Sequence, residues 1–262
     1  MAGIRNIAKE RLEAGELAIG VGLRQARTVD IAKIMKTAGY DFLFIDCEHS
    51  ALSVDVAGQI STAAQDAGIT PIVRVPGMQH FHASRALDAG AQGIVVPHVD
   101  TAEIAAQMAE QCRYPPRGRR SVTGALPQID FASWPLGEAT AAIDAATLVV
   151  VMIETPRAVA NVNEIAAVPG VDVLLVGAND LCLEMGIPGQ LDHPRVVEAF
   201  ERITAACRAS GKHAGLGGVY TPPLIEGYVG MGFRFILAGS DLSFMLAAAK
   251  ERAAAVRAMS PR

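Results

Sequence analysis

The chain has 262 residues, of which 51% are hydrophobic and 19% are charged, and its formal net charge at pH 7 is −4. This composition supports a large buried core and excludes a disordered chain. The sequence contains no basic run and no cationic amphipathic stretch, so neither nucleic acid nor a membrane surface is an expected partner. The length suits a single (β/α)8 domain, which needs about 250 residues.

The cysteines and the N-terminal segment indicate the cellular setting. Cys47, Cys112, Cys182 and Cys207 form no CxxC pair, so no zinc ribbon or redox motif is indicated and reduced thiols are expected. Residues 1–16 are charged and lack the apolar stretch of a secretory signal. No segment approaches the roughly 20 apolar residues of a membrane span. The sequence therefore predicts a cytoplasmic protein.

Short apolar runs alternate with longer alanine-rich stretches of helical character. The runs are nearly continuously apolar, which is typical of strands buried on both faces of a parallel sheet. Eight occur, at residues 17–23, 41–46, 70–75, 92–97, 147–154, 171–177, 213–218 and 233–239. Alternating strands and helices predict an α/β fold, a closed (β/α)8 TIM barrel forming one domain over residues 1–262. An open doubly wound sheet is the structural alternative, although it more often has five or six strands.

The interval between the fourth and fifth runs is longer than the others. It contains a predicted helix over residues 101–112 and then the segment RYPPRGRRSVTGALPQIDFASWPLG, which is rich in Pro, Gly and Arg. Long loops in compact domains are usually functional. The sequence therefore predicts an extended loop here, with residues 114–123 on the rim of the site.

Two acidic residues end neighbouring strands at the face where barrel enzymes place their sites. Charged residues that directly follow buried strands are costly unless they are paired or ligated. Glu154 and Asp180 are such residues, and two carboxylates with waters form a typical site for a divalent metal such as Mg²⁺, Mn²⁺ or Co²⁺. The alternative is that Asp180, like Asp241, caps the helix that follows it.

An arginine and a histidine are the other candidates at this face. The planar guanidinium of Arg74 suits a carboxylate or an enolate oxygen, and the alternative is a structural ion pair with Asp46 or Glu48. His49 is a candidate general base or proton shuttle, oriented by either of these carboxylates, although a histidine that closes a loop is equally common. The remaining histidines, including His98, are expected to be structural or to lie on the surface.

No lysine is expected inside the barrel, where a Schiff-base aldolase needs one. Four of the five lysines fall in helical segments and the fifth precedes its strand; they are Lys9, Lys33, Lys36, Lys250 and Lys212. Enolate chemistry in this chain would therefore require a metal and an arginine.

Several motifs carry a resemblance to a known family. In chain order they are DFLFIDCEHS, RVP, ALDAGAQGIVVPHV, RYPPRGRRS, IETP and VGANDL. Together they resemble the HpcH/HpaI family of class II pyruvate aldolases over nearly the whole chain. The resemblance implies that Glu154 and Asp180 hold a metal that binds the 2-oxo acid, and that Arg74 stabilises its enolate. It also implies that His49, supported by Asp46, works with a metal-bound water in proton transfer.

The resemblance extends to substrate contacts and assembly. The backbone around Gly177, Ala178 and Asn179 would meet the substrate carboxylate, and Leu216, at the end of the seventh run, is also expected to contact substrate. Asp88 resembles a position that reaches the site of a neighbouring subunit. Members of the family form hexamers built as trimers of dimers, so a homo-oligomer is expected.

The chain departs from the family pattern where the pocket is shaped. Met152 replaces a common Gln, Asn179 replaces a common Pro, and Leu23 or Arg24 replaces a common aromatic residue. These replacements change the expected size and polarity of the donor and acceptor pockets, and so the resemblance does not identify the physiological substrate.

The expected function is that of a metal-dependent class II aldolase. It would cleave 4-hydroxy-2-oxo acids reversibly to pyruvate, or hydroxypyruvate, and an aldehyde through a metal-stabilised enolate. One alternative is a carbon–carbon lyase of the citrate-lyase β type acting on acyl-CoA, which would need a channel for CoA that the sequence does not identify. The other is a non-catalytic barrel that binds 2-oxo acids and releases no pyruvate.

Overall fold

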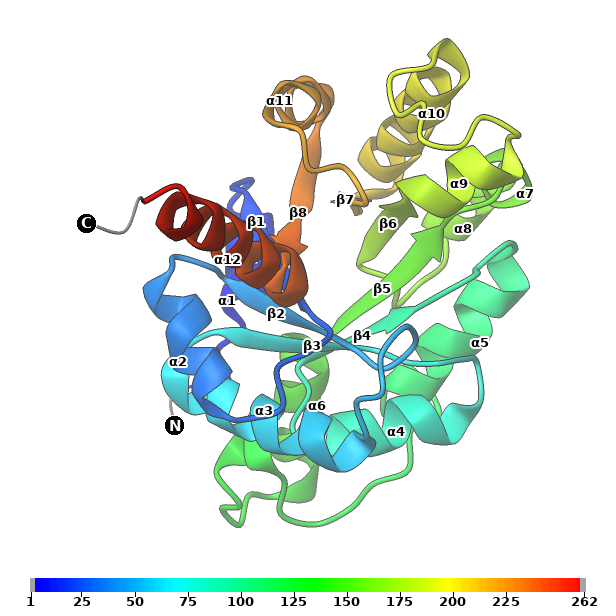
Figure 1. The fold of residues 1–262 in the computed structure, drawn as a ribbon. Coiled ribbons are helices and arrows are strands. Elements are labelled where there is room, and N and C mark those ends of the chain that lie inside the picture. The colour runs from blue at the N-terminus through cyan, green and yellow to red at the C-terminus, as the bar shows by residue number, and fades with distance from the viewer. Residues whose placement is uncertain (1–2, 260–262) are drawn as a thin grey trace.

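The computed structural model describes residues 3–259, which form a closed barrel of eight parallel strands with helices between them (Figure 1). β1 pairs with both β2 and β8, which excludes the open sheet. The strands are β1 Ala18–Leu23, β2 Phe42–Asp46, β3 Thr70–Arg74, β4 Gly93–Val96, β5 Leu148–Ile153, β6 Val173–Gly177, β7 His213–Gly217 and β8 Phe233–Ser240. All eight predicted strands are confirmed to within two residues. Residues 1–2 and 260–262 of the predicted domain lie outside the described residues.

Helices connect the strands and begin and end at residues suited to those places. They are α1 Ile7–Glu13, α2 Asp30–Thr37, α3 Val54–Ala67, α4 His80–Asp88, α5 Ala102–Cys112, the 3-10 helix η1 Pro127–Ile129, α6 Leu136–Ala146, α7 Pro156–Ala160, α8 Val162–Ala166, α9 Ala178–Glu184, α10 Pro194–Ser210, α11 Pro222–Met231 and α12 Asp241–Arg257. The side chains of Ser53 and Thr101 cap α3 and α5. Gly68 ends α3 with φ +70°, a left-handed conformation that a residue with a Cβ rarely adopts. Among residues 3–259, no helix is both long and apolar enough to cross a membrane.

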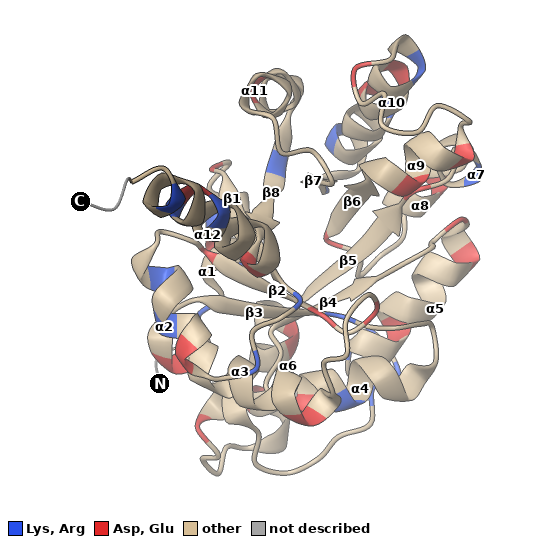
Figure 2. Cartoon of the chain, viewed as in Figure 1, with Lys and Arg blue, Asp and Glu red and all other residues tan. Residues whose placement is uncertain are grey.

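Two apolar layers fill the fold, one inside the barrel and one between the barrel and its helices. Inside, the rings of Phe42 and Phe235 stack with centroids 4.2 Å apart. Gly20 makes room for this pair, because a Cβ there would lie 2.0 Å from the Phe42 ring. Figure 2 shows that most charged segments lie on the helices and loops, while the strands are largely uncharged. Charged groups that do occur at strand ends are therefore exceptions to the pattern.

The long segment after α5 lies at the opposite end of the barrel from its predicted place. It leads from the end of α5 to the start of β5, and in a (β/α)8 barrel such connections lie at the N-terminal ends of the strands. It is also not a plain loop, because it contains η1 and the start of α6. Tyr114, Leu126 and Ile129 form a small buried cluster there. The prediction that residues 114–123 border the site of their own chain is therefore wrong.

The last helix, α12, stands apart from the barrel core. None of its residues is buried, and Leu242, Met245 and Leu246 are exposed by 37%, 59% and 48%. Its C-terminal end points away from the barrel (Figure 1). The helix therefore leaves apolar side chains uncovered within one chain.

Candidate active site

A cavity of about 290 Å³ opens at the C-terminal ends of the strands. Most of the predicted site residues line this cleft, as do several residues of the β1 and β8 ends. The lining comprises Gly22, Arg24, Phe44, Asp46, His49, Arg74, Met152, Leu175, Gly177, Ala178, Asn179, Asp180, Gly217, Gly218, Tyr220, Leu237, Gly239, Ser240 and Ser243. The structure thus gathers residues from both halves of the sequence at one mouth.

Arg74, at the end of β3, is 9% exposed and held by two carboxylates. Its Nε and Nη2 donate to Oδ1 and Oδ2 of Asp46 at 3.0 and 2.7 Å, and its Nη1 lies 2.9 Å from Oε2 of Glu48. Burial alone would raise the pKa of Asp46, but the hydrogen bonds and charge of Arg74 lower it overall. The predicted ion pair is therefore present, and it fixes a planar cation in the wall of the cleft.

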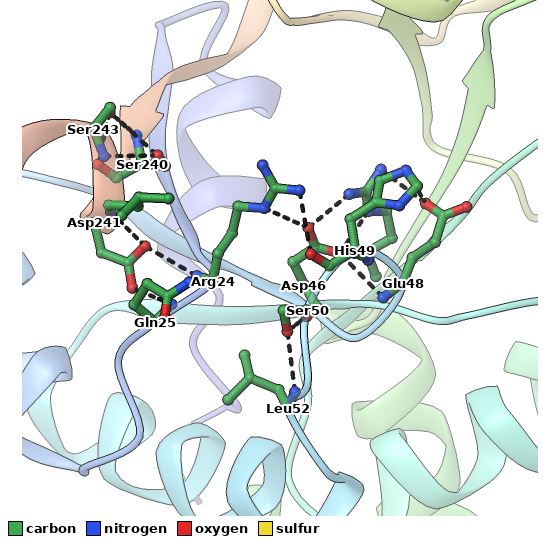
Figure 3. Close-up of polar contacts among 12 residues, drawn as sticks. Arg24, Gln25, Asp46, Glu48, His49, Ser50, Leu52, Ser240, Asp241 and Ser243 are labelled. Atoms are coloured by element: carbon green, nitrogen blue, oxygen red, sulfur yellow. Dashed lines mark hydrogen bonds and ion pairs between the residues drawn. The ribbon is translucent and has the colours of Figure 1, made fainter.

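His49 is held differently from the expected arrangement. Oδ1 of Asp46 accepts a hydrogen bond from the backbone N–H of His49 at 3.0 Å, and another from Glu48 at 3.1 Å. The imidazole itself faces Glu48, with Nε2 3.7 Å from Oε2, as Figure 3 shows. Asp46 thus contacts His49 through the backbone only, while the ring lies beside Glu48, so the role of Asp46 in orienting the imidazole stays a prediction.

Glu154, which follows β5, is a carboxylate that the fold buries to 2% exposure. Its Oε1 accepts from the backbone N–H of His98 at 2.7 Å. Burial is the largest cause that raises the pKa of Glu154, and the nearby charges of Asp180 and Glu48 add to the rise. Gly177 makes room for this carboxylate, because a Cβ there would lie 2.4 Å from Oε2.

Asp180 lies in the first turn of α9, as the third residue of that helix. The N-cap position belongs to Gly177, and at the other strand end Ser240 caps α12. The alternative that Asp180 or Asp241 serves as the N-cap is therefore wrong. Asp180 is exposed toward the cleft and its charge acts on Glu154.

The carboxylate pair suits a divalent cation. Arg74 is paired with Asp46 and Glu48, so its charge is already engaged, and the contacts of Glu154 are with the backbone N–H and the ring of His98. Burial first, and the charges of Asp180 and Glu48 after it, raise the pKa of Glu154, and a hard divalent ion with oxygen ligands would stabilise its charged form. No group of three or more His, Cys, Asp or Glu side chains with metal-binding geometry exists among residues 3–259. A divalent ion held by two carboxylates alone keeps coordination positions for substrate and water.

His98 is a functional candidate that the sequence interpretation assigned to structure or surface. Its Nδ1 lies 3.0 Å from Oε1 of Glu154 and its Nε2 lies 3.4 Å from Oε1 of Glu48. Its φ of 54° is rare for a residue with a side chain. The signal that could have identified it is its position two residues after the end of β4, where barrel enzymes place site residues.

Two other predicted residues lie away from the cleft. Leu216 is fully buried in the outer apolar layer between barrel and helices, so its predicted substrate contact is wrong. Asp88 ends α4, and its Oδ1 accepts from Nη2 of Arg120 at 2.7 Å. Lys9 and Lys212 hydrogen bond to the backbone carbonyls of Ala145 and Val171.

Comparison with known proteins agrees with this geometry. The sequence model of the family "HpcH/HpaI aldolase/citrate lyase" matches residues 24–248. The chain is 39% identical over 262 residues to the 4-hydroxy-4-methyl-2-oxoglutarate aldolase of Hapsidospora irregularis, covering 98% of this chain and 96% of that protein. It is 34% identical over 241 residues to the 2-keto-3-deoxy-L-rhamnonate aldolase of Escherichia coli K12, covering 91% and 88% of the two chains.

A solved structure extends the match to three dimensions. The crystal structure of an HpcH/HpaI aldolase from Desulfitobacterium hafniense superposes with a TM-score of 0.92 at 28% identity, covering 98% of each chain. The family match and the two relatives each span most of the sequence. The chain therefore belongs to the HpcH/HpaI aldolase/citrate lyase family.

Proposed function

We propose that this class II aldolase reversibly cleaves 4-hydroxy-2-oxo acids to pyruvate, or hydroxypyruvate, and an aldehyde. The observation that carries the proposal is the pair of carboxylates Glu154 and Asp180: Glu154 is buried and feels the charge of Asp180, which lines the same cleft as the fixed cation Arg74. The two relatives are named for 2-oxo acids of this type. The proposal includes one catalytic domain of the (β/α)8 type over residues 1–262.

Aldolases of this family depend on a divalent metal, and Glu154 and Asp180 are the residues that would hold it. The metal, as Mg²⁺, Mn²⁺ or Co²⁺, would supply a Lewis acid that polarises the 2-oxo group. Arg74 would donate from its guanidinium to the same oxo oxygen and stabilise the charge that develops there. The backbone at Gly177 and Ala178 lines the cleft and would position the substrate carboxylate.

His49 would accept and return the protons that move during cleavage and addition. In cleavage the 4-hydroxyl loses its proton, the C3–C4 bond breaks, the aldehyde leaves and the remaining pyruvate enolate takes a proton at carbon. An imidazole changes its protonation near neutral pH and can serve in both directions. The ring of His49 is 53% exposed and Glu48 lies beside Nε2, so it can exchange a proton both with the cleft and with solvent.

The test is pyruvate release from a 4-hydroxy-2-oxo acid before and after chelation. We expect release that EDTA abolishes and added Mg²⁺ or Mn²⁺ restores, because the substrate-binding charge depends on the metal. Cleavage of an acyl-CoA substrate without pyruvate release would identify the citrate-lyase β alternative. Binding of pyruvate without any cleavage would identify the non-catalytic alternative.

Arg74 should be required for its shape as well as its charge. Arg74→Lys keeps a cation but loses the planar contact with Asp46. Losing one preorganised oxyanion donor typically costs about 10² in turnover, and we expect at least this loss in kcat. Steady-state kinetics would measure it, with thermal unfolding and metal titration as controls for folding. A lysine variant with near wild-type turnover would mean that Arg74 is structural.

We infer a homo-oligomer, most simply a hexamer arranged as a trimer of dimers. Two observations support it: α12 presents uncovered Leu242, Met245 and Leu246, and Asp88 lies outside the cleft of its own chain. Light scattering after size exclusion should give a multiple of the 27.5 kDa chain mass. Met245→Glu with Leu246→Glu should shift the mass downward, because charge would then enter an apolar contact. A fully active wild-type monomer would contradict the inference.

A further inference from the structure

Arg24 is a second cation in the cleft that the proposed chemistry does not use. It lies just beyond β1 with its side chain 43% exposed, and it lines the same cavity as Arg74. Its Nε lies 3.5 Å from Oδ2 of Asp46, which is a long contact to a carboxylate that already accepts two short hydrogen bonds from Arg74. The positive charge of Arg24 is therefore only weakly neutralised by this carboxylate.

The remaining contact of the Arg24 guanidinium is also modest. Its Nη2 donates to the carbonyl oxygen of His49 at 3.2 Å. Within residues 3–259, no side-chain or backbone acceptor bonds to its Nη1. A partly exposed guanidinium with open donors is suited to receive an anion, and the planar fork favours a carboxylate.

The position of Arg24 around the barrel gives it a specific place along a substrate. The candidate metal ligands follow β5 and β6, whereas Arg24 follows β1, which lies between β2 and β8. In a closed ring of eight strands, β1 and β5 are opposite one another. A 2-oxo acid held at Glu154 and Asp180 would therefore extend its far end across the mouth toward Arg24. The far end of such a substrate is the part that leaves as the aldehyde.

The carboxylate of Asp241, which follows β8, fixes the backbone of the loop that carries Arg24. Oδ1 of Asp241 accepts from the N–H of Arg24 at 3.0 Å, and its Oδ2 accepts from Gln25 and Ala26 at 2.9 and 2.7 Å. Figure 3 shows Asp241 beside Arg24, with the guanidinium directed toward Asp46. The cation is thus presented at a defined place, which lowers the ordering cost of binding an anion.

We propose that Arg24 binds a carboxylate on the aldehyde half of the substrate, which makes it the residue that selects dicarboxylic 4-hydroxy-2-oxo acids. The inference rests on the proposed aldolase function. Ser240 and Ser243 also line the cleft, but their hydroxyls are engaged in the cap of α12, so Arg24 is the group assigned to the carboxylate.

The test compares acceptor aldehydes that carry a carboxylate with neutral ones in the synthetic direction. The charged acceptors are glyoxylate and 4-oxobutanoate, and the neutral partners are acetaldehyde and butanal. Removing a charge-assisted hydrogen bond costs about 1.5–3 kcal/mol, so Arg24→Gln should lower the charged-to-neutral ratio of kcat/KM by about 10- to 100-fold. Arg24→Lys should retain part of the ratio because it keeps the charge.

Arg27→Gln is the matched control, since Arg27 is exposed on the same loop but does not line the cleft. The Arg27 variant should leave the charged-to-neutral ratio of kcat/KM unchanged. The comparison therefore separates direct binding of the carboxylate by Arg24 from the long-range electrostatic effect of any nearby cation. An Arg24→Gln variant that loses activity equally on charged and neutral acceptors, or loses none, would overturn the proposal. Failure of the aldolase function itself would be distinguishable, because the wild-type protein would then add pyruvate to no acceptor.

Discussion

Replacing Glu154 with glutamine is expected to abolish divalent-metal binding and to lower aldol cleavage by about 10⁴-fold, the rate equivalent of several kcal/mol of lost charge stabilisation. The amide keeps the shape that fits against Gly177 but cannot supply the charge. Asp180→Asn should have a similar effect. Isothermal titration with Mn²⁺ and pyruvate-release kinetics would measure both losses.

Glu164→Gln is the matched control for this experiment. Glu164 is an exposed carboxylate on α8, outside the cleft, so its variant should bind metal and cleave substrate as the wild-type protein does. Circular dichroism would confirm that the site variants remain folded. A Glu154→Gln protein that retains full activity in the presence of a chelator would show that the carboxylate pair is not the metal site.

The second large effect is expected at His49. His49→Ala should lower aldol turnover by about 10²- to 10⁴-fold, the usual contribution of a general acid–base group. It should leave metal and pyruvate affinity nearly unchanged, because Glu154 and Asp180 remain. Metal-dependent exchange of the pyruvate methyl protons with D₂O, followed by NMR, should slow as well, since that exchange needs no aldehyde.

His80→Ala provides the comparison, because His80 is exposed at the start of α4 and does not line the cleft. Wild-type exchange with slowed cleavage in the His49 variant would place His49 on the aldehyde half of the reaction. If both rates stay at wild-type values, His49 closes its loop and another group is the base.

The fold was predictable because each strand is buried on both faces and therefore reads as a continuous apolar run. The same continuous apolar pattern does not show which side chains of a strand point into the barrel and which point toward the helices. Leu216 stands near the end of β7, but successive side chains point to opposite faces, and Gly217 rather than Leu216 lines the cleft. Applying the two-residue period to β7 would have prevented that error.

The geometry of the loops could not be predicted from the sequence. The contact between the His49 ring and Glu48, rather than Asp46, depends on how residues 47–50 turn back after β2. His98 reaches Glu154 because its backbone adopts a positive φ that nothing in its residue type requires. The positions of the strand ends predicted which residues lie close together at the cleft. The contact partners of each side chain could not be predicted, because they depend on the local path of the backbone.

The contact of Asp241 with residues 24–26 has a consequence for how the protein folds. It joins positions 217 residues apart in the chain, so the β1 loop cannot take its final form until β8 is in place beside β1. Pairings of such long sequence separation form slowly, since much chain entropy is lost before they contribute. The mouth of the barrel should therefore be among the last regions to become protected from hydrogen exchange during refolding, and Asp241→Ala should delay protection at Arg24 and Ala26 more than in β3 or β4.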